Sequence, residues 1–80
     1  MEKVKQLIEQ SINELGYILD DVSLIKESGN LFLRVVIDKN GLVDIEDCIK
    51  VSHAINPILD KEDPVKETYV LDVCSKEKGE

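Results

Sequence analysis

The chain has 80 residues, of which 42% are hydrophobic and 34% are charged, a composition typical of one small globular domain rather than of a disordered chain. Its 17 acidic and 10 basic residues leave a formal net charge of −7, which argues against direct binding to a nucleic-acid phosphate backbone. An acidic domain attracts basic partners at long range, although the same charge also serves solubility.

The first half of the chain is predicted to form a helix followed by two strands. Apolar residues recur at helical spacing from Val4 to Leu15, so we expect a helix over residues 2–15 that stops at Gly16. Residues 17–26 indicate an extended segment, and a turn cluster separates them from a second strand, rich in Leu, Val and Ile, over residues 31–38. The short connection predicts an antiparallel hairpin.

A second helix is predicted after a break at residues 39–41, where Asn and Gly tolerate positive φ angles. Asp44 is a suitable N-cap, and Glu46 and Asp47 favour the positive end of a helix. A stripe of residues then follows the helical period: Ile45, Cys48, Ile49, Ser52, Ile55, Ile58 and Leu59. These signals together predict an amphipathic helix that begins after Asp44.

Pro57 conflicts with a continuous second helix because it removes a backbone hydrogen bond, so we expect a kink or a loosely wound end near it. A polar loop over residues 60–68 and a third strand over residues 69–75 follow. Residues 76–80 are expected to form a flexible polar tail outside a single domain spanning residues 1–75.

The element order α-β-β-α-β predicts an α+β domain built as a two-layer sandwich, with a small, mostly antiparallel three-stranded sheet and both helices on one face. Period-two alternation turns one set of strand residues toward the helices: Leu33, Val35, Ile37, Leu71 and Val73. The other set lies on an open face: Phe32, Arg34, Val36, Asp38, Val70, Asp72 and Cys74. This face is either a docking surface or a place where Arg34 pairs with Asp72 or Asp38 across strands.

The sequence contains no pattern typical of an enzyme or a metal site. Cys48 and His53 lie five residues apart on one helix and face different directions, so Cys48 is expected in the core. One His and two Cys cannot form a four-ligand zinc site, and the acids at 44, 46 and 47 lack the spacing of a calcium loop, so helix capping explains them better. Asp20 and Asp21 are neighbours on a strand and are expected to point to opposite faces. We predict no catalytic activity, cofactor, metal or small-molecule substrate.

Localisation and redox state follow from two further observations. The first residues carry no basic region followed by an apolar run, and no stretch is long enough to cross a bilayer, so we expect a cytoplasmic protein that does not bind a membrane. The two cysteines, Cys48 and Cys74, do not make a disulfide framework.

Direct RNA binding is a rival function because small α-β-β-α-β domains resemble RNA-binding modules. The chain has no Gly-x-x-Gly loop of the KH type, and Phe32 is its only phenylalanine, whereas a stacking sheet of the RRM type needs paired aromatics. Tyr17 and Tyr69 lie in different strands, and Arg34 alone cannot supply a basic groove. The sequence therefore argues against direct RNA binding by this domain.

A series of short motifs extends over about residues 1–75. The central series is a strand ending in Ile-Asp, a Gly-containing turn, an acidic-acidic-Cys helix start and a Val-Ser pair. Its positions here are Arg34, Val35, Ile37, Asp38, Gly41, Val43, Glu46, Asp47, Cys48, Val51 and Ser52. Further motifs lie on either side, over residues 19–22, 60–64 and 69–73. The whole series resembles the N-terminal domain of the RimP family of ribosome maturation factors.

The resemblance implies a non-catalytic, cytoplasmic factor that binds the immature small (30S) ribosomal subunit and assists incorporation of a basic ribosomal protein near the decoding centre. The resemblance also implies a second, SH3-like domain, which we do not expect within these 80 residues, and the family's Ser-Ser-Pro-Gly exit from the last strand is replaced by Val-Cys-Ser-Lys-Glu-Lys over residues 73–78. The chain is therefore expected to be either a domain fragment or a variant without the second domain.

We predict a ribosome-biogenesis domain that captures a basic protein surface by electrostatic attraction. The candidate partner-binding residues are Phe32, Arg34, Asp38, Asp44, Glu46, Asp47 and Asp72. The alternative is a generic acidic interaction or dimerisation module that docks through the open face around Phe32, Val36 and Val70.

Overall fold

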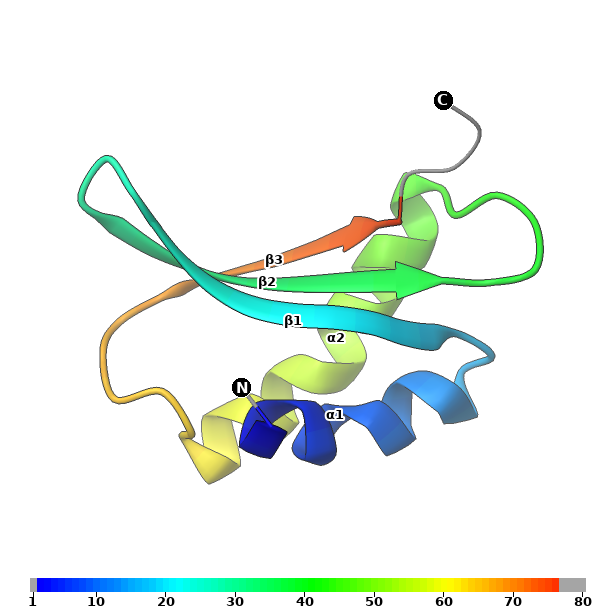
Figure 1. The fold of residues 1–80 in the computed structure, drawn as a ribbon. Helices are drawn as coiled ribbons and strands as arrows, with labels where there is room; N and C mark the ends of the chain where they lie inside the picture. Colours follow the sequence, from blue (N-terminus) through cyan, green and yellow to red (C-terminus); the bar gives the residue numbers. More distant parts are fainter. Residues whose placement is uncertain (1, 77–80) are drawn as a thin grey trace.

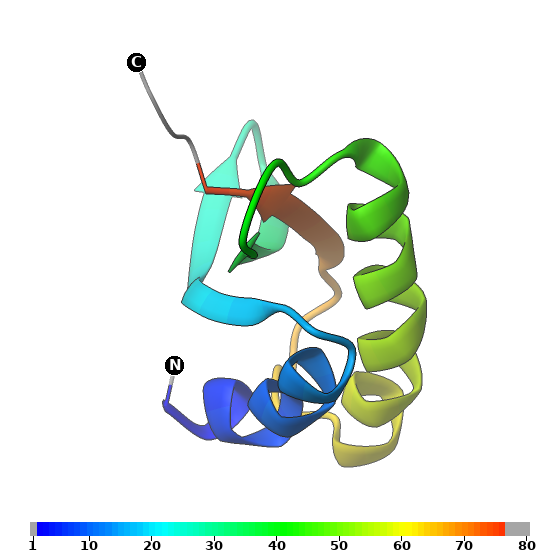
Figure 2. The ribbon, with the colours of Figure 1, turned by 90° about the vertical axis from the view of Figure 1, so that its right-hand side faces the viewer.

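The computed structural model describes residues 2–76, and its elements follow the predicted order (Figure 1). They are α1 (Glu2–Glu14), β1 (Ile18–Glu27), β2 (Asn30–Asp38), α2 (Ile45–Glu62) and β3 (Val70–Ser75). The strands form one sheet in the order β1-β2-β3, and both helices pack against the same face of it (Figure 2). The predicted α+β class is confirmed. Of the tail predicted over residues 76–80, only Lys76 lies within the described residues.

α1 ends at the predicted glycine. Its buried side chains lie four positions apart on one face: Val4, Ile8 and Ile12. Gly16 has a φ of +96°, which is strained for residues with a side chain. The amide of Gly16 donates to the carbonyl of Asn13 (3.0 Å), and the amide of Tyr17 donates to the carbonyl of Ile12 (3.1 Å), as in a Schellman cap. This turn places Tyr17 in the core directly after the helix.

The sheet contains one antiparallel and one parallel pair of strands. β1 and β2 form the predicted hairpin, closed at Ser28 and Gly29, whose φ angles of 52° and 79° match a type I′ turn. β3 pairs in parallel with the other side of β2, from Val70 opposite Phe32 onward. The sheet is therefore mixed rather than mostly antiparallel as expected, because α2 carries the chain back to the end of the sheet at which β2 begins.

A β-bulge interrupts the alternation of β1. Leu19 lies opposite Ile37, but the next residue in register is Asp21. Leu19 and Val22 are consequently both buried, and the two aspartates between them are both exposed. The expectation that Asp20 and Asp21 point to opposite faces was therefore wrong, because the extra residue shifts the pattern that strict alternation assumes.

The core lies between the sheet and the two helices. The central strand β2 contributes three fully buried residues: Leu33, Val35 and Ile37. α2 contributes residues about one turn apart: Val51, Ile55 and Leu59. Burial of one such side chain is worth roughly 1.5–3 kcal/mol, so these rows, with that of α1, hold the layers together. Leu71 and Val73 of β3 are half-buried at the margin of this core.

α2 runs past Pro57 to Glu62. Pro57 cannot donate to the carbonyl of His53, but both residues are exposed, while Leu59 in the next turn stays fully buried. The helix therefore does not end near Pro57; it ends at Asp63, which adopts a left-handed φ of 47° as the C-cap. Among the described residues, no helix is both long and apolar enough to cross a membrane.

Candidate functional site

The predicted partner-binding residues lie in two places. Four belong to β2 and β3: Phe32, Arg34, Asp38 and Asp72. Three lie at the start of α2: Asp44, Glu46 and Asp47. At the end of β2, the carboxylate of Asp38 accepts a hydrogen bond from the amide of Lys39 (2.8 Å).

The open face of the sheet is apolar with an ion pair at its centre. Arg34 and Asp72 lie opposite each other in register, and Nε of Arg34 is 3.2 Å from Oδ2 of Asp72. The side chains are about two-fifths exposed, so the pair is worth roughly 0.2–1 kcal/mol. Around it, Phe32 and Val36 are half-buried and Val70 is 52% exposed. The predicted cross-strand pairing of Arg34 is thus confirmed, with Asp72 as the partner.

Asp44 and Asp47 cap the start of α2 reciprocally. The amide of Asp47 donates to Oδ1 of Asp44 (3.0 Å), and the amide of Asp44 donates to Oδ2 of Asp47 (2.9 Å). This capping box satisfies two backbone donors of the helix start and places both carboxylates at its positive end. The interpretation of these residues as caps is confirmed. Within residues 2–76, no group of His, Cys, Asp or Glu side chains could hold a metal ion.

Asp47 also joins three segments that are distant in the sequence. The hydroxyl of Tyr17 donates to Oδ1 of Asp47, and Nζ of Lys39 lies 2.9 Å from Oδ2. The Lys39 ammonium is also 5.9 Å from the centre of the Tyr17 ring, within the range of a cation–π contact. This cluster ties the end of α1, the end of β2 and the start of α2 together.

The cluster keeps the Asp47 carboxylate charged. The hydrogen bond from Tyr17, then the amide of Asp44 and the ammonium of Lys39, hold the pKa of Asp47 well below its ordinary value. The same hydrogen bond, followed by burial and the negative charge of Asp47, raises the pKa of Tyr17 to about 12. Because both its oxygens are engaged and its side chain is only 14% exposed, Asp47 acts mainly within the fold.

The remaining surface at the start of α2 combines an acid with apolar side chains. Glu46 is exposed and makes no hydrogen bond or ion pair with another residue in the described part of the chain. Leu42 is 85% exposed, and Ile45 is 75% exposed. Exposed apolar groups rimmed by charge are typical of docking surfaces.

The two cysteines are free thiols without signs of activation. Cys48 and Cys74 are half-buried. Cys48 was expected in the core, but it packs against the margin of the core instead. Burial, and then nearby carboxylates, raise the pKa of both thiols, so they stay protonated at neutral pH.

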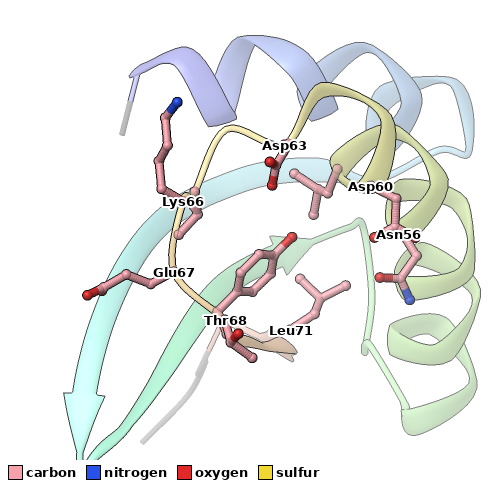
Figure 3. A pocket seen from close by; sticks show the side chains of 10 residues that line it. Asn56, Asp60, Asp63, Lys66, Glu67, Thr68 and Leu71 are labelled. Atoms are coloured by element: carbon pink, nitrogen blue, oxygen red, sulfur yellow. The ribbon is translucent and has the colours of Figure 1, made fainter.

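A groove that the sequence analysis did not predict runs between α2 and β3. One part is lined by residues of the first half of α2 and of β3: Ile45, Cys48, Ile49, Ser52, His53, Leu71, Asp72 and Val73. The other part lies between the second half of α2 and the segment before β3, where Asn56, Asp60 and Thr68 surround Leu71 (Figure 3). Leu71 lines both parts, so they adjoin. Their volumes, about 290 and 340 Å³, are at the low end for small-molecule sites.

The features that sequence reasoning missed differ in the signal they left. Tyr17 and Asp47 are 30 residues apart, so no local pattern connects them. The groove did have a signal in the sequence, because the apolar stripe predicted for α2 contains more residues than one buried helix face can hold. Its members Ile45 and Ile49 are 75% and 49% exposed and form the groove wall instead of the core.

The sequence model of the RimP N-terminal domain matches residues 7–76, from within α1 to the end of β3. The matched region therefore includes all three strands, the whole of α2, the Asp47 cluster and the groove. RimP proteins are cytoplasmic, non-catalytic ribosome maturation factors that associate with the 30S subunit. The chain thus belongs to the RimP family, through its N-terminal domain, with a non-catalytic role in ribosome maturation.

Proposed function

We propose that this domain binds the immature 30S subunit and assists its assembly by capturing a basic ribosomal protein. The association of the family with the 30S subunit supports the target, and the net charge of −7 supports a basic partner. The observation that carries the proposal is the surface at the start of α2, where Leu42, Ile45 and Glu46, which lie within five consecutive residues, are all exposed. Lys or Arg of the partner meets the carboxylate while apolar groups cover the isoleucine and leucine.

The ion pairs within the domain reduce the number of acidic residues that are suited to this contact. Asp47 is paired with Lys39, and Asp72 is paired with Arg34, so the charges of both are balanced within the domain. Glu46 has no such partner among the described residues. An exposed carboxylate of this kind steers association, and salt weakens its effect.

Titration of the fluorescently labelled domain with purified 30S subunits, across a salt series, tests the proposal. Affinity is expected to fall as salt rises, and Glu46→Lys is expected to weaken binding by about two- to tenfold at low salt. Glu27→Lys is the matched control, because it makes the same charge change at an exposed residue at the end of β1, outside both the start of α2 and the groove. Equal losses in the two variants contradict the assigned surface. Tighter binding to naked small-subunit RNA than to the 30S subunit contradicts a protein partner.

Self-association through the open sheet face is the second candidate. Val70 is 52% exposed beside half-buried Phe32, and the charges of Arg34 and Asp72 on that face balance each other. Sedimentation distinguishes the two: a salt-insensitive dimer that Phe32→Asp abolishes supports this candidate over the first.

A further inference from the structure

Within the described residues, the outer edge of β3 is open. β3 is the last strand of the sheet, and its second edge pairs with no strand among residues 2–76. The amide of Lys76 donates to the carbonyl of Ile37 on β2 (2.9 Å). In a parallel strand, the backbone amides of alternate residues point to the partner strand. The amides of Cys74, Asp72 and Val70 therefore point to β2, as that of Lys76 does. The amides of Leu71, Val73 and Ser75 therefore point to the open edge.

The groove beside α2 exposes this edge to a partner. Three consecutive residues of β3 line it, and their side chains alternate between the two faces of the sheet. The groove must therefore run along the edge of β3, because a groove on one face would be lined by alternate residues only. The opposite wall is the flank of α2 that carries Ile45 and Ile49, which are 75% and 49% exposed.

The edge of β3 lacks three features by which proteins protect an edge strand: a proline, a bulge and an unpaired charge. The strand contains no proline, its register with β2 is regular, and its single charged residue, Asp72, is paired with Arg34. Protected edges carry bulges, prolines or unpaired charges. The backbone of β3 is thus available for pairing with another extended chain.

The charges that line the groove indicate which kind of partner can bind along the edge of β3. Apart from Asp72, which Arg34 balances, three carboxylates line its two parts, against one lysine: Asp60, Asp63, Glu67 and Lys66. Figure 3 shows the Lys66 side chain extending away from Leu71. A second copy of this domain would bring another net charge of −7 to the same place, so repulsion disfavours it. A positively charged occupant is favoured.

We propose that an extended basic segment of a protein partner adds to the edge of β3 as a fourth strand. Its backbone bonds with the free amides and carbonyls of Leu71, Val73 and Ser75. Its alternate apolar side chains enter the groove against Ile49, and its Lys or Arg side chains meet the carboxylates along the rim. This inference rests on the proposed function in one respect, since it specifies how the basic partner is held.

Amide hydrogen exchange followed by NMR tests the strand addition directly. The probe is a peptide of alternating lysine and valine, as long as β3. At saturation it is expected to slow exchange of the amides of Leu71, Val73 and Ser75 by about tenfold or more, because each gains an acceptor. The amide of Cys74, which already faces β2, is expected to change little. A peptide of alternating glutamate and valine is expected not to bind.

Two variants test whether the basic peptide binds in the groove rather than elsewhere on the surface. Ile49→Lys places a positive charge in the groove wall and is expected to weaken binding of the basic peptide by about tenfold. Ile18→Lys is the matched control, because Ile18 is a comparably exposed isoleucine (57%) at the start of β1, and it is expected to change the affinity by less than about twofold. Circular dichroism of both variants checks that each remains folded.

The outcomes distinguish this inference from the proposed function. If 30S subunits bind but Ile49→Lys binds them as tightly and no β3 amide is protected, strand addition is wrong and the proposed function stands. If 30S subunits do not bind but the basic peptide protects the three amides, the edge assignment holds and the proposed function fails. Protection of these amides by self-association, without peptide, overturns the choice of occupant.

Discussion

The two edges of the sheet are built in opposite ways. The edge strand β1 contains a bulge and four charged residues: Asp20, Asp21, Lys26 and Glu27. Asp20 also pairs with Lys76 at 3.2 Å. The edge strand β3 is regular and has one charged residue, whose charge is already balanced. Since bulges and charges prevent pairing with other chains, the domain shields one edge and, within residues 2–76, leaves the other open beside the groove between α2 and β3.

α2 shows the same contrast between its two flanks. On one flank, Asp47 is held by Tyr17 and Lys39, which ties the helix to the rest of the fold. On the other, Ile45 and Ile49 are exposed along the groove. The helix thus stabilises the domain with one flank and presents the other to solvent.

The largest effect is expected where β3 meets β2. The amide of Cys74 points to β2, so Cys74→Pro removes a bond of the sheet and leaves a carbonyl unpaired. We expect the free energy of unfolding to fall by roughly 3 kcal/mol. Ser75→Pro, at an exposed residue whose amide points to the open edge, is expected to lower it by less than about 1 kcal/mol. Urea unfolding measures both, and equal losses would show that the two edges of β3 have been assigned incorrectly.

The next effect concerns the Tyr17 cluster on the closed side. Tyr17→Phe keeps the buried ring but removes the hydroxyl that donates to Asp47, so we expect the free energy of unfolding to fall by roughly 1–2 kcal/mol. Tyr69→Phe is the control, because Tyr69 is half-buried and no side-chain hydrogen bond to it is recorded in the described residues. Thermal melting compares the variants, and equal small changes would mean that the cluster does not stabilise the fold.

The same cluster is expected to make the stability of the domain depend on pH at both the alkaline and the acidic end. The pKa of Tyr17 is raised from 10.0 to about 12, so its contribution is complete below pH 10 and is lost as the pH rises through 12. The pKa of Asp47 is lowered from 3.8, so its contribution is present above pH 3.8 and is lost as the pH falls through the folded value. Tyr17→Phe should therefore flatten the stability curve at both ends. Curves of the same shape for both proteins would contradict this coupling.

The smallest effect on stability is expected at the open side. Arg34→Gln breaks an exposed cross-strand ion pair and should change the free energy of unfolding by less than about 1 kcal/mol. It also leaves Asp72 unneutralised next to the groove, so the basic peptide should bind about twofold more tightly. Fluorescence titration measures the change. Weaker binding would instead indicate that Arg34 contacts the partner itself.

Signals that act within a few residues determined the elements of this protein and the type of fold. The apolar spacing before Gly16 predicted α1 and its end, and Asp44 predicted the start of α2, because caps and helical faces depend on nearby residues. The ordered motifs from Arg34 to Ser52 also predicted the family, which the match over residues 7–76 confirms.

Tertiary structure alone decided how these elements meet. The parallel direction of β3, the bulge at Asp20, the bond from Tyr17 to Asp47 and the groove beside Ile49 all join residues that are distant in the chain or depend on register. Local preferences cannot specify such features, because the free energy that selects them comes from packing the two helices and the sheet together. The same packing leaves β3 at the edge, which is why the candidate binding surface became visible only in the folded domain.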